Sequence, residues 1–313
     1  MKSSSSRRKF IRHLSMAPLA TTTAFPLLAS TAYSPVIYPS FPANTRLSLN
    51  CYSFNTPLRT GSIDLFDVLE FCAKYGIDAI DPTGYYFPGY PKVPDNEYLN
   101  RFKRQAFLMG IDISGTGVRN DFTLTDPDIR KQEVLLVKKW IEAAARMGAP
   151  TLRIFIGVTQ PESEGFTRDQ VFEWMASDIR ECCEYAGKYG IVLGLQNHWD
   201  YIKTSDDILR IFRMVDSEWL GLNLDIGSFR ADPYEEVKKT IHLAVTWQIK
   251  ENVFVNEQQQ KTDYHKLFRI IQESGYRGYL PLETLGPGDP YEKLPIMIGE
   301  VKKALAETVT SNR

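Results

Sequence analysis

The stretch IVLGLQNH at residues 191–198 predicts a short buried strand that ends in three polar residues. Three later apolar runs end in the same way, on Asp225, Lys250 and Glu283. In an α/β barrel the carboxyl ends of the parallel strands meet at one rim, and the functional groups of such barrels lie there. The repeated pattern therefore predicts a parallel barrel with its polar side chains gathered at one end.

The chain on either side of this stretch alternates strand-like and helix-like segments. Strands are expected at 46–54, 76–83, 111–118, 151–157, 191–198, 220–227, 245–250 and 278–283. Helices are expected at 63–75, 95–109, 126–147, 168–189, 204–215, from 232 onward, at 263–273 and at 289–306. Glycine follows many of these helices, as it does in left-handed C-terminal caps. Eight strands alternating with eight helices over about 260 residues predict a single-domain α/β fold, a (β/α)8 barrel at residues 46–309.

Charge and motifs exclude several kinds of partner. The net charge is −1, so the chain lacks the basic surface of a nucleic-acid-binding protein. No GxGxxG follows the first strand, and no phosphate-loop signature occurs. The four cysteines show neither a metal-ligand spacing nor a disulfide framework, so we expect buried thiols. The expected partner is a small molecule, and the sequence indicates no particular oligomeric state.

The N-terminus differs in character from the rest. Residues 3–12 read SSSSRRKFIR, and a moderately apolar run follows at 14–29. This order predicts an export signal at residues 1–32, and the Arg7-Arg8 pair is typical of twin-arginine signals. A disordered basic tail is the alternative. Residues 33–45 then form a linker. No later run reaches the roughly 18 apolar residues of a membrane-spanning helix, so we expect an exported, periplasmic protein with no span in the mature chain.

Side-chain alternation separates the barrel interior from its outside. In LGLNLD (220–225) the leucines at 222 and 224 face the helices, which leaves Asn223 and Asp225 inside. The same test places many other polar side chains inside: Asn50, Tyr52, Asp81, Ser114, Thr116, Arg153, Gln196, His198, Thr246, Gln248, Lys250 and Glu283. Barrel interiors are normally filled by branched apolar residues. Each unsatisfied buried polar group costs about 1–3 kcal/mol, so a functional site is a better explanation than a polar plug without chemistry.

Four short motifs occur in order on the expected strands: LQNH (195–198), LDIGSF (224–229), QIKE (248–251) and GYLPLETL (278–285). GTGVRNDF at 115–122 supports them. Over residues 46–307 the chain thereby resembles the xylose isomerase-like TIM barrel proteins, which are sugar phosphate isomerases and epimerases. The resemblance implies a carbohydrate substrate.

In that superfamily a divalent metal is held by Glu, Asp, His and Glu on strands five to eight. The matching positions are Gln196, Asp225, Gln248 and Glu283, so two of the four depart from the pattern. A histidine that often follows the Asp is replaced by Ser228. Two carboxylates and two amides can still bind a hard ion, which makes Mn²⁺ or Mg²⁺ a better fit than Zn²⁺. The alternative is a metal-free network in which Lys250 and Arg153 pair with the two carboxylates.

The reaction that the resemblance implies is proton abstraction beside a carbonyl group. Gln196 cannot act as a base, so a two-base epimerisation lacks one partner unless His198 replaces it. A one-base reaction remains possible, with Glu283 as the base, the metal or Lys250 stabilising the oxyanion, and His198 returning a proton. This chemistry suits a sugar isomerase or epimerase.

Five further residues are predicted to bind the sugar: Asn50, Asp81, Arg153, Trp199 and Ser228. The loop GYYFPGYP (84–91) and Trp199 supply apolar faces on which a sugar could stack. Two alternatives stay open, a lyase that carries out β-elimination on a 3-oxo-glycoside and a non-catalytic sugar-binding barrel with a degraded metal site. An abasic-site endonuclease is disfavoured by the net charge of −1 and the four histidines.

Overall fold

The computed structural model describes residues 44–310. The predicted export signal at 1–32 lies outside these residues, as does the predicted linker apart from Asn44 and Thr45, which belong to the first strand. None of the helices in the described part of the chain combines the length and apolar composition needed to cross a membrane.

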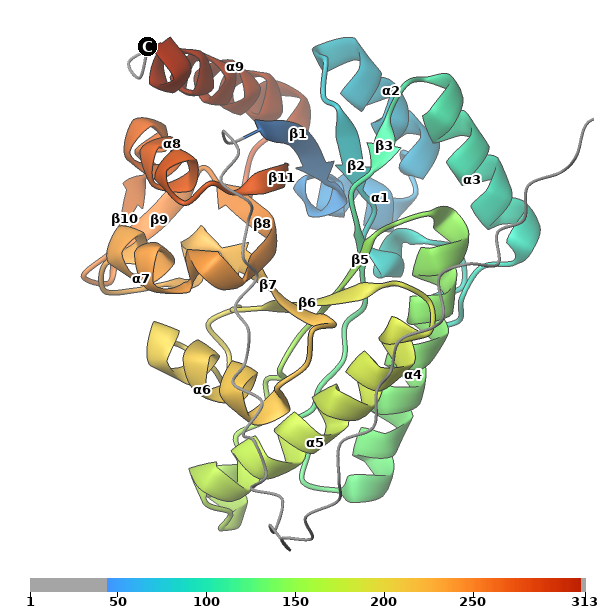
Figure 1. Ribbon diagram of the computed structural model, residues 1–313. Coiled ribbons are helices and arrows are strands. Elements are labelled where there is room, and N and C mark those ends of the chain that lie inside the picture. Colours follow the sequence, from blue (N-terminus) through green and yellow to red (C-terminus); the bar gives the residue numbers. More distant parts are fainter. Residues whose placement is uncertain (1–43, 311–313) are drawn as a thin grey trace, which may run out of the picture. The chain divides into compact units, whose positions relative to one another are not determined.

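The described residues form one parallel barrel surrounded by helices (Figure 1). Its strands are β1 (Asn44–Asn50), β2 (Ala79–Asp81), β3 (Asp112–Ile113), β4 (Thr116–Gly117), β5 (Thr151–Ile154), β6 (Val192–Gln196), β7 (Leu220–Asp225), β8 (Ala244–Lys250) and β11 (Arg277–Glu283). Their order in the sheet is β3-β2-β1-β11-β8-β7-β6-β5-β4. Only two residues separate β3 from β4, so the two edges of the sheet are halves of one interrupted strand. The predicted (β/α)8 barrel is therefore confirmed.

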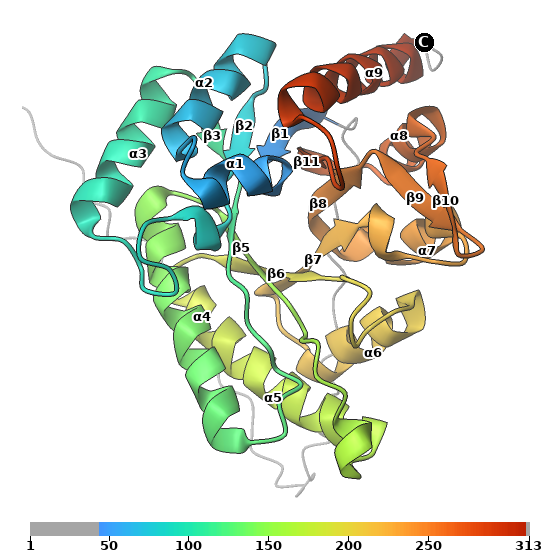
Figure 2. The same ribbon diagram turned by 180° about the vertical axis from the view of Figure 1, so that it is seen from behind.

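Eight helices cover the outside of the strands in both views of the described residues (Figures 1 and 2). They are α2 (Leu65–Tyr75), α3 (Asn96–Leu108), α4 (Pro127–Met147), α5 (Arg168–Gly187), α6 (Ser205–Val215), α7 (Pro233–Thr240), α8 (Tyr264–Glu273) and α9 (Pro290–Thr310). The two ends of helix α4 illustrate why the helix boundaries were predictable. The Asp126 side chain accepts hydrogen bonds from two backbone N–H groups of its first turn, and Gly148 ends it at φ 79°.

Two parts of the fold differ from the expectation. Strand β1 ends at Asn50 and not at residue 54, because the Asn50 side chain accepts a hydrogen bond from the backbone N–H of Tyr52 and starts a 3-10 turn. Helix α1 (Asn55–Thr60) follows that turn. After β8, the hairpin of β9 (Asn252–Val255) and β10 (Gln258–Lys261) is added to the barrel. Its turn residues lack the Asn-Gly signature that would have predicted it.

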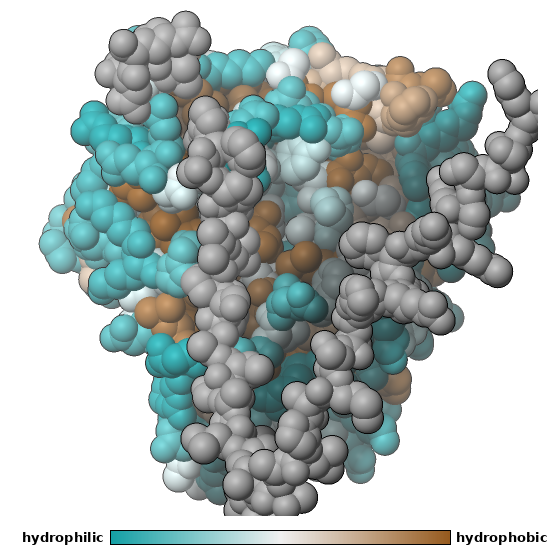
Figure 3. Space-filling model, in the orientation of Figure 1, coloured by the Kyte–Doolittle hydropathy of each residue, from teal (hydrophilic) through white to brown (hydrophobic). Residues whose placement is uncertain are grey.

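The apolar core lies between the strands and the helices, as the alternation predicted. Leu222, Leu224, Leu280 and Leu282 are fully buried. Burying such a side chain stabilises the fold by about 1.5–3 kcal/mol. On the face drawn in Figure 3, hydrophilic residues cover much of the helix surfaces, and hydrophobic residues show between them. The polar residues that alternate with these leucines along the strands face the other way and line the barrel interior.

Candidate active site

A pocket of about 160 Å³ opens at the carboxyl ends of the strands, and we call it the central pocket. Its lining consists of Asn50, Tyr52, Tyr85, Arg119, Arg153, Phe155, Gln196, His198, Gln248, Lys250, Glu283 and Leu285. Asn50, Gln196, Lys250 and Glu283 are each the last residue of a strand. The structure thus brings together seven of the residues that the sequence predicted for the site.

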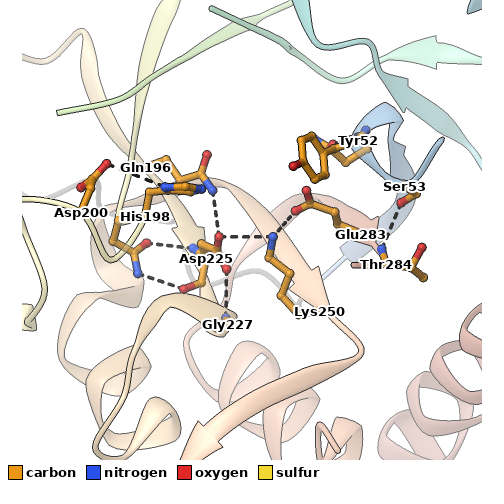
Figure 4. A network of polar contacts seen from close by, with 12 residues as sticks. Tyr52, Ser53, Gln196, His198, Asp200, Asp225, Gly227, Lys250, Glu283 and Thr284 are labelled. Atoms are coloured by element: carbon orange, nitrogen blue, oxygen red, sulfur yellow. Dashed lines mark hydrogen bonds and ion pairs between the residues drawn. The ribbon is translucent and has the colours of Figure 1, made fainter. Parts of the chain in front are cut away.

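The charged centre of this pocket consists of Asp225, Lys250 and Glu283. In the sheet, β8 lies between β7 and β11, and Glu283 pairs in register with Lys250. The Lys250 ammonium therefore lies between the two carboxylates (Figure 4). Its Nζ contacts Glu283 Oε2 and lies 3.3 Å from Asp225 Oδ2. All three side chains are at least 92% buried, since their exposed fractions are 2%, 6% and 8%.

Asp225 is held in a fixed orientation by its neighbours. Gln196 Nε2 donates to Asp225 Oδ2 over 2.8 Å, and the backbone N–H of Gly227 donates to Oδ1 over 2.9 Å. The Asn197 side chain bonds the Asp225 backbone twice, at 2.8 and 2.9 Å. Both oxygens of the carboxylate and the backbone on either side are thus restrained, which keeps Asp225 beside Lys250.

Burial and mutual attraction act in opposite directions on the charged centre. Burial acts to lower the pKa of the Lys250 ammonium, but Asp225 and Glu283 outweigh it and raise this pKa above its usual value. Burial raises the pKa of the Glu283 carboxyl, and Lys250 opposes that rise. Counted at their formal charges, one ammonium and two carboxylates together give −1.

The four predicted metal-ligand positions can be tested against this geometry. No group of three or more His, Cys, Asp or Glu side chains in residues 44–310 is arranged to hold a metal ion. The ammonium of Lys250 lies between Asp225 and Glu283, and Gln196 turns its N–H₂ group, not its carbonyl, toward Asp225. Gln248 Oε1 alone among these buried side-chain atoms has no hydrogen-bond partner. The arrangement does not fit a divalent ion, and the metal role of these residues stays a prediction.

Arg153 lines the central pocket, and its charge acts on the buried carboxyl of Asp81. Asn50 Nδ2 donates to Asp81 Oδ2 over 2.6 Å. Burial raises the pKa of Asp81, and Arg153, Asn50 and Gln248 oppose that rise. The Arg153 guanidinium lies 4.3 Å from the ring centre of Phe155. It also lies against Gly117, where an added Cβ would be 2.6 Å from Arg153 Nε.

A side pocket of about 280 Å³ adjoins the central pocket. Arg119, Phe155 and His198 line both. The side pocket also contains Asp200, whose side chain is 5% exposed and lies 3.8 Å from His198 Nδ1. Asp200 Oδ2 has no hydrogen-bond partner among the described residues.

The two groups of this side pocket are both close to neutral. Burial raises the pKa of Asp200 to about 7. Burial of the His198 ring, which packs edge-on against Phe155, lowers the pKa of that imidazole below its usual value. Both shifts favour the neutral form of the group.

Three predicted substrate-binding residues, Asp81, Trp199 and Ser228, do not line either of these pockets. The Trp199 ring lies 5.1 Å from the Arg230 guanidinium and 5.4 Å from Lys203 Nζ. Ser228 is 93% buried in the 3-10 turn after β7. Asp81 is 93% buried and accepts a hydrogen bond from Asn50, which does line the central pocket. The binding roles of Trp199 and Ser228 stay predictions that their positions do not support.

Sequence reasoning missed Asp200, Arg119 and Phe155. Asp200 and Arg119 lie in loops, where no alternation separates inward from outward side chains. Phe155 follows directly after β5, two residues beyond Arg153, and therefore has the same inward parity. It was missed because only polar inward residues were selected. Arg119 does belong to the GTGVRNDF segment, and Tyr85 belongs to the GYYFPGYP loop. These two segments were therefore the only parts of the sequence analysis that pointed to Arg119 and Tyr85.

Several solved structures share the fold of this chain. A D-psicose 3-epimerase from Clostridium cellulolyticum H10 superposes with a TM-score of 0.68 at 15% identity, over 85% of this chain and 98% of that chain. The 3-keto-D-glucoside 4-epimerase YcjR from E. coli gives 0.66 at 13% identity, over 83% and 99%. The IOLI protein, solved with a zinc atom, gives 0.66 at 18% identity, over 85% and 98%.

Sequence comparison identifies the family directly. No curated protein matches the chain significantly. The family model described as xylose isomerase-like TIM barrel matches residues 69–301, which is most of the chain. The chain therefore belongs to the xylose isomerase-like TIM barrel family.

Proposed function

We propose that this protein is an enzyme of the isomerase or epimerase type, which removes a proton beside the carbonyl group of a small sugar or keto-sugar. The observation that carries the proposal is the buried Lys250–Glu283 pair at the bottom of the central pocket. It places a carboxylate base and a cation side by side, which is the combination that enolisation requires. The epimerases with the same fold agree with this class of reaction.

The roles of the residues follow from their charge. Glu283 takes the proton from the carbon beside the carbonyl group, and the electron pair of the C–H bond moves onto the carbonyl oxygen. The Lys250 ammonium stabilises the enediolate oxygen that results. Asp225 is a positioning residue, because it holds Lys250 through the contact at 3.3 Å. Return of the proton to the neighbouring carbon, with the hydroxyl proton passing between the two oxygens, completes an isomerisation. Protonation of the same carbon from its opposite face needs a second donor, a role for His198, and completes an epimerisation once Glu283 and His198 re-equilibrate their protons with solvent.

The lining of the central pocket suits a carbohydrate. Asn50 and Gln196 present side-chain amides, and Gln248 Oε1 is a buried acceptor without a partner. A sugar hydroxyl would supply the missing donor. Tyr52 and Tyr85 meet edge to face at 6.3 Å and offer apolar surface beside these polar groups. Pockets of this kind combine a few placed polar groups with aromatic walls. If residues 1–32 do direct export, the substrate would be a free sugar or glycoside.

The side pocket favours a second candidate, a lyase acting on a 3-oxo-glycoside. Here Glu283 removes the proton beside the carbonyl group, the bond from the next carbon to the aglycone oxygen breaks, and a double bond forms between the two carbons. The leaving oxygen needs a proton, which Asp200 can supply directly or through His198. The side pocket of about 280 Å³ offers space for the aglycone.

Solvent proton exchange distinguishes these candidates. Purified protein in D₂O is incubated with free sugars, sugar phosphates and 3-oxo-glycosides, and deuterium at the carbon beside the carbonyl group is measured by NMR. Exchange that is lost in Glu283→Gln and retained in the matched surface variant Glu300→Gln supports the enzyme. Release of the aglycone identifies the lyase. Sugar binding without exchange, unchanged in Glu283→Gln, would show a non-catalytic binding protein.

A further inference from the structure

We infer that the ammonium group of Lys250 takes the place of a divalent cation in the central pocket, so that the native protein works without one. This inference deepens the proposed function, since it names the electrophile of that site. It also makes a statement about cation binding that can be measured without any substrate.

The position of Lys250 is the first support. Strand β8 lies between β7 and β11 in the sheet, so a long side chain at its last residue reaches the space between the carboxylates of the two neighbouring strands. Lys250 Nζ contacts Glu283 and lies 3.3 Å from Asp225. A metal ion that bound both carboxylates would have to occupy the position of this ammonium (Figure 4).

The charge of the site is the second support. Asp225 and Glu283 contribute −2 and Lys250 contributes +1, and Gln196 and Gln248 add none. A divalent ion beside Lys250 would meet a positive charge at contact distance in a buried site, where screening by solvent is weak. The remaining charge of −1 is too small to offset that repulsion for an ion that must also lose its water.

The hydrogen bonds of the candidate ligands are the third support. Both oxygens of Asp225 already accept hydrogen bonds, from Gly227 and from Gln196. The Gln196 amide presents a donor where a metal requires an acceptor. An ammonium group has three N–H donors, and the structure gives two of them acceptors on Asp225 and Glu283. The third is available to the carbonyl oxygen of a substrate.

Metal content and a single substitution test the inference. Full-length wild-type protein is incubated with Mn²⁺, desalted and analysed by plasma mass spectrometry, and we expect less than about 0.1 ion per chain. Lys250→Met keeps a similar side-chain length and leaves the two carboxylates facing each other without a cation. A Mn²⁺ titration followed by electron paramagnetic resonance should then show at least a tenfold gain in affinity. Lys250→Arg, which keeps the charge, should show no gain.

The outcomes separate this inference from the proposed function. Stoichiometric Mn²⁺ in the wild type that is lost in Asp225→Asn would overturn it, and so would a folded Lys250→Met protein with no gain. If Lys250→Met does not fold, the wild-type metal content still decides the matter. Metal-free wild type without proton exchange on any sugar would leave the inference standing and remove the proposed reaction. Proton exchange that depends on a metal ion would overturn the inference and leave the proposed reaction standing.

Discussion

The charged centre and the side pocket differ in how their buried carboxylates are paired, although Arg119, Phe155 and His198 line both the side pocket and the central pocket. In the charged centre, the Lys250 ammonium contacts Glu283 and lies 3.3 Å from Asp225, so each buried carboxylate has a cation beside it. Among the described residues no lysine or arginine forms an ion pair with Asp200, and its Oδ2 lacks a hydrogen-bond partner there. Its pKa is raised to about 7 by burial. A buried carboxylate beside a lysine is thus a stable charge, and one without a lysine is a proton donor.

The largest expected effect comes from removing the base of the charged centre. Glu283→Gln keeps the shape of the side chain and its contact with Lys250 but cannot accept a proton. General base catalysis contributes about 10²–10⁴-fold, so we expect a loss of that size in kcat for proton exchange, with KM little changed. Equal exchange rates in Glu283→Gln and wild type would show that the charged centre is structural.

Removing the cation should affect stability as well as activity. Lys250→Met leaves two buried carboxylates unpaired, and removing one partner of a buried ion pair costs about 3–5 kcal/mol. Without Lys250 the carboxyl pKa values rise, so the folded protein binds protons that the unfolded chain releases. The deficit in the free energy of unfolding should therefore be larger at pH 8 than at pH 5. Urea titrations at both pH values measure it, and a pH-independent deficit would contradict the account.

Lys250→Arg serves as the matched control. It retains a cation between Asp225 and Glu283 and should lose less than half of the stability that Lys250→Met loses. An equal loss in both variants would mean that packing, and not charge, determines the effect.

The side pocket should show a pH dependence of its own. The folded pKa of Asp200, about 7, lies above the unfolded value of about 3.9. The folded state therefore holds a proton that the unfolded state releases, and the associated stability is present below pH 4 and lost as the pH rises to 7. The loss is roughly 2–4 kcal/mol. Asp200→Asn should remove this part of the pH dependence in urea titrations.

Asp169→Asn is the control for that measurement, since Asp169 is an exposed residue of α5 paired with Arg210. It should leave the slope of stability against pH close to that of the wild type. If Asp200→Asn and Asp169→Asn behave alike, Asp200 does not carry its proton in the folded protein.

The sequence predicted the fold better than it predicted the site. Alternation identified Asp225, Lys250 and Glu283 as inward residues because each ends a regular strand. Which charges would meet depended on β8 lying between β7 and β11, so the metal and the metal-free network were both open on sequence grounds. The hairpin β9–β10 and Asp200 were missed because they follow the strands, where the period of two no longer applies. Trp199 was selected for its aromatic ring, and its position next to Arg230 required the structure.

The smallest expected effect is a change in KM when an aromatic residue of the pocket walls is replaced, compared with an aromatic residue outside the pockets. Phe155 lines both pockets and packs against His198 and Arg153. Phe155→Leu should raise KM about three- to tenfold, because a sugar face and the Arg153 guanidinium both lose their ring contact. Trp199→Ala removes a larger ring that contacts Lys203 and Arg230 and should change KM less than twofold. The comparison is made on the same substrate by initial rates. A larger effect from Trp199→Ala would mean that the loop after β6 closes over the bound sugar, since Trp199 could reach the pocket only in that way.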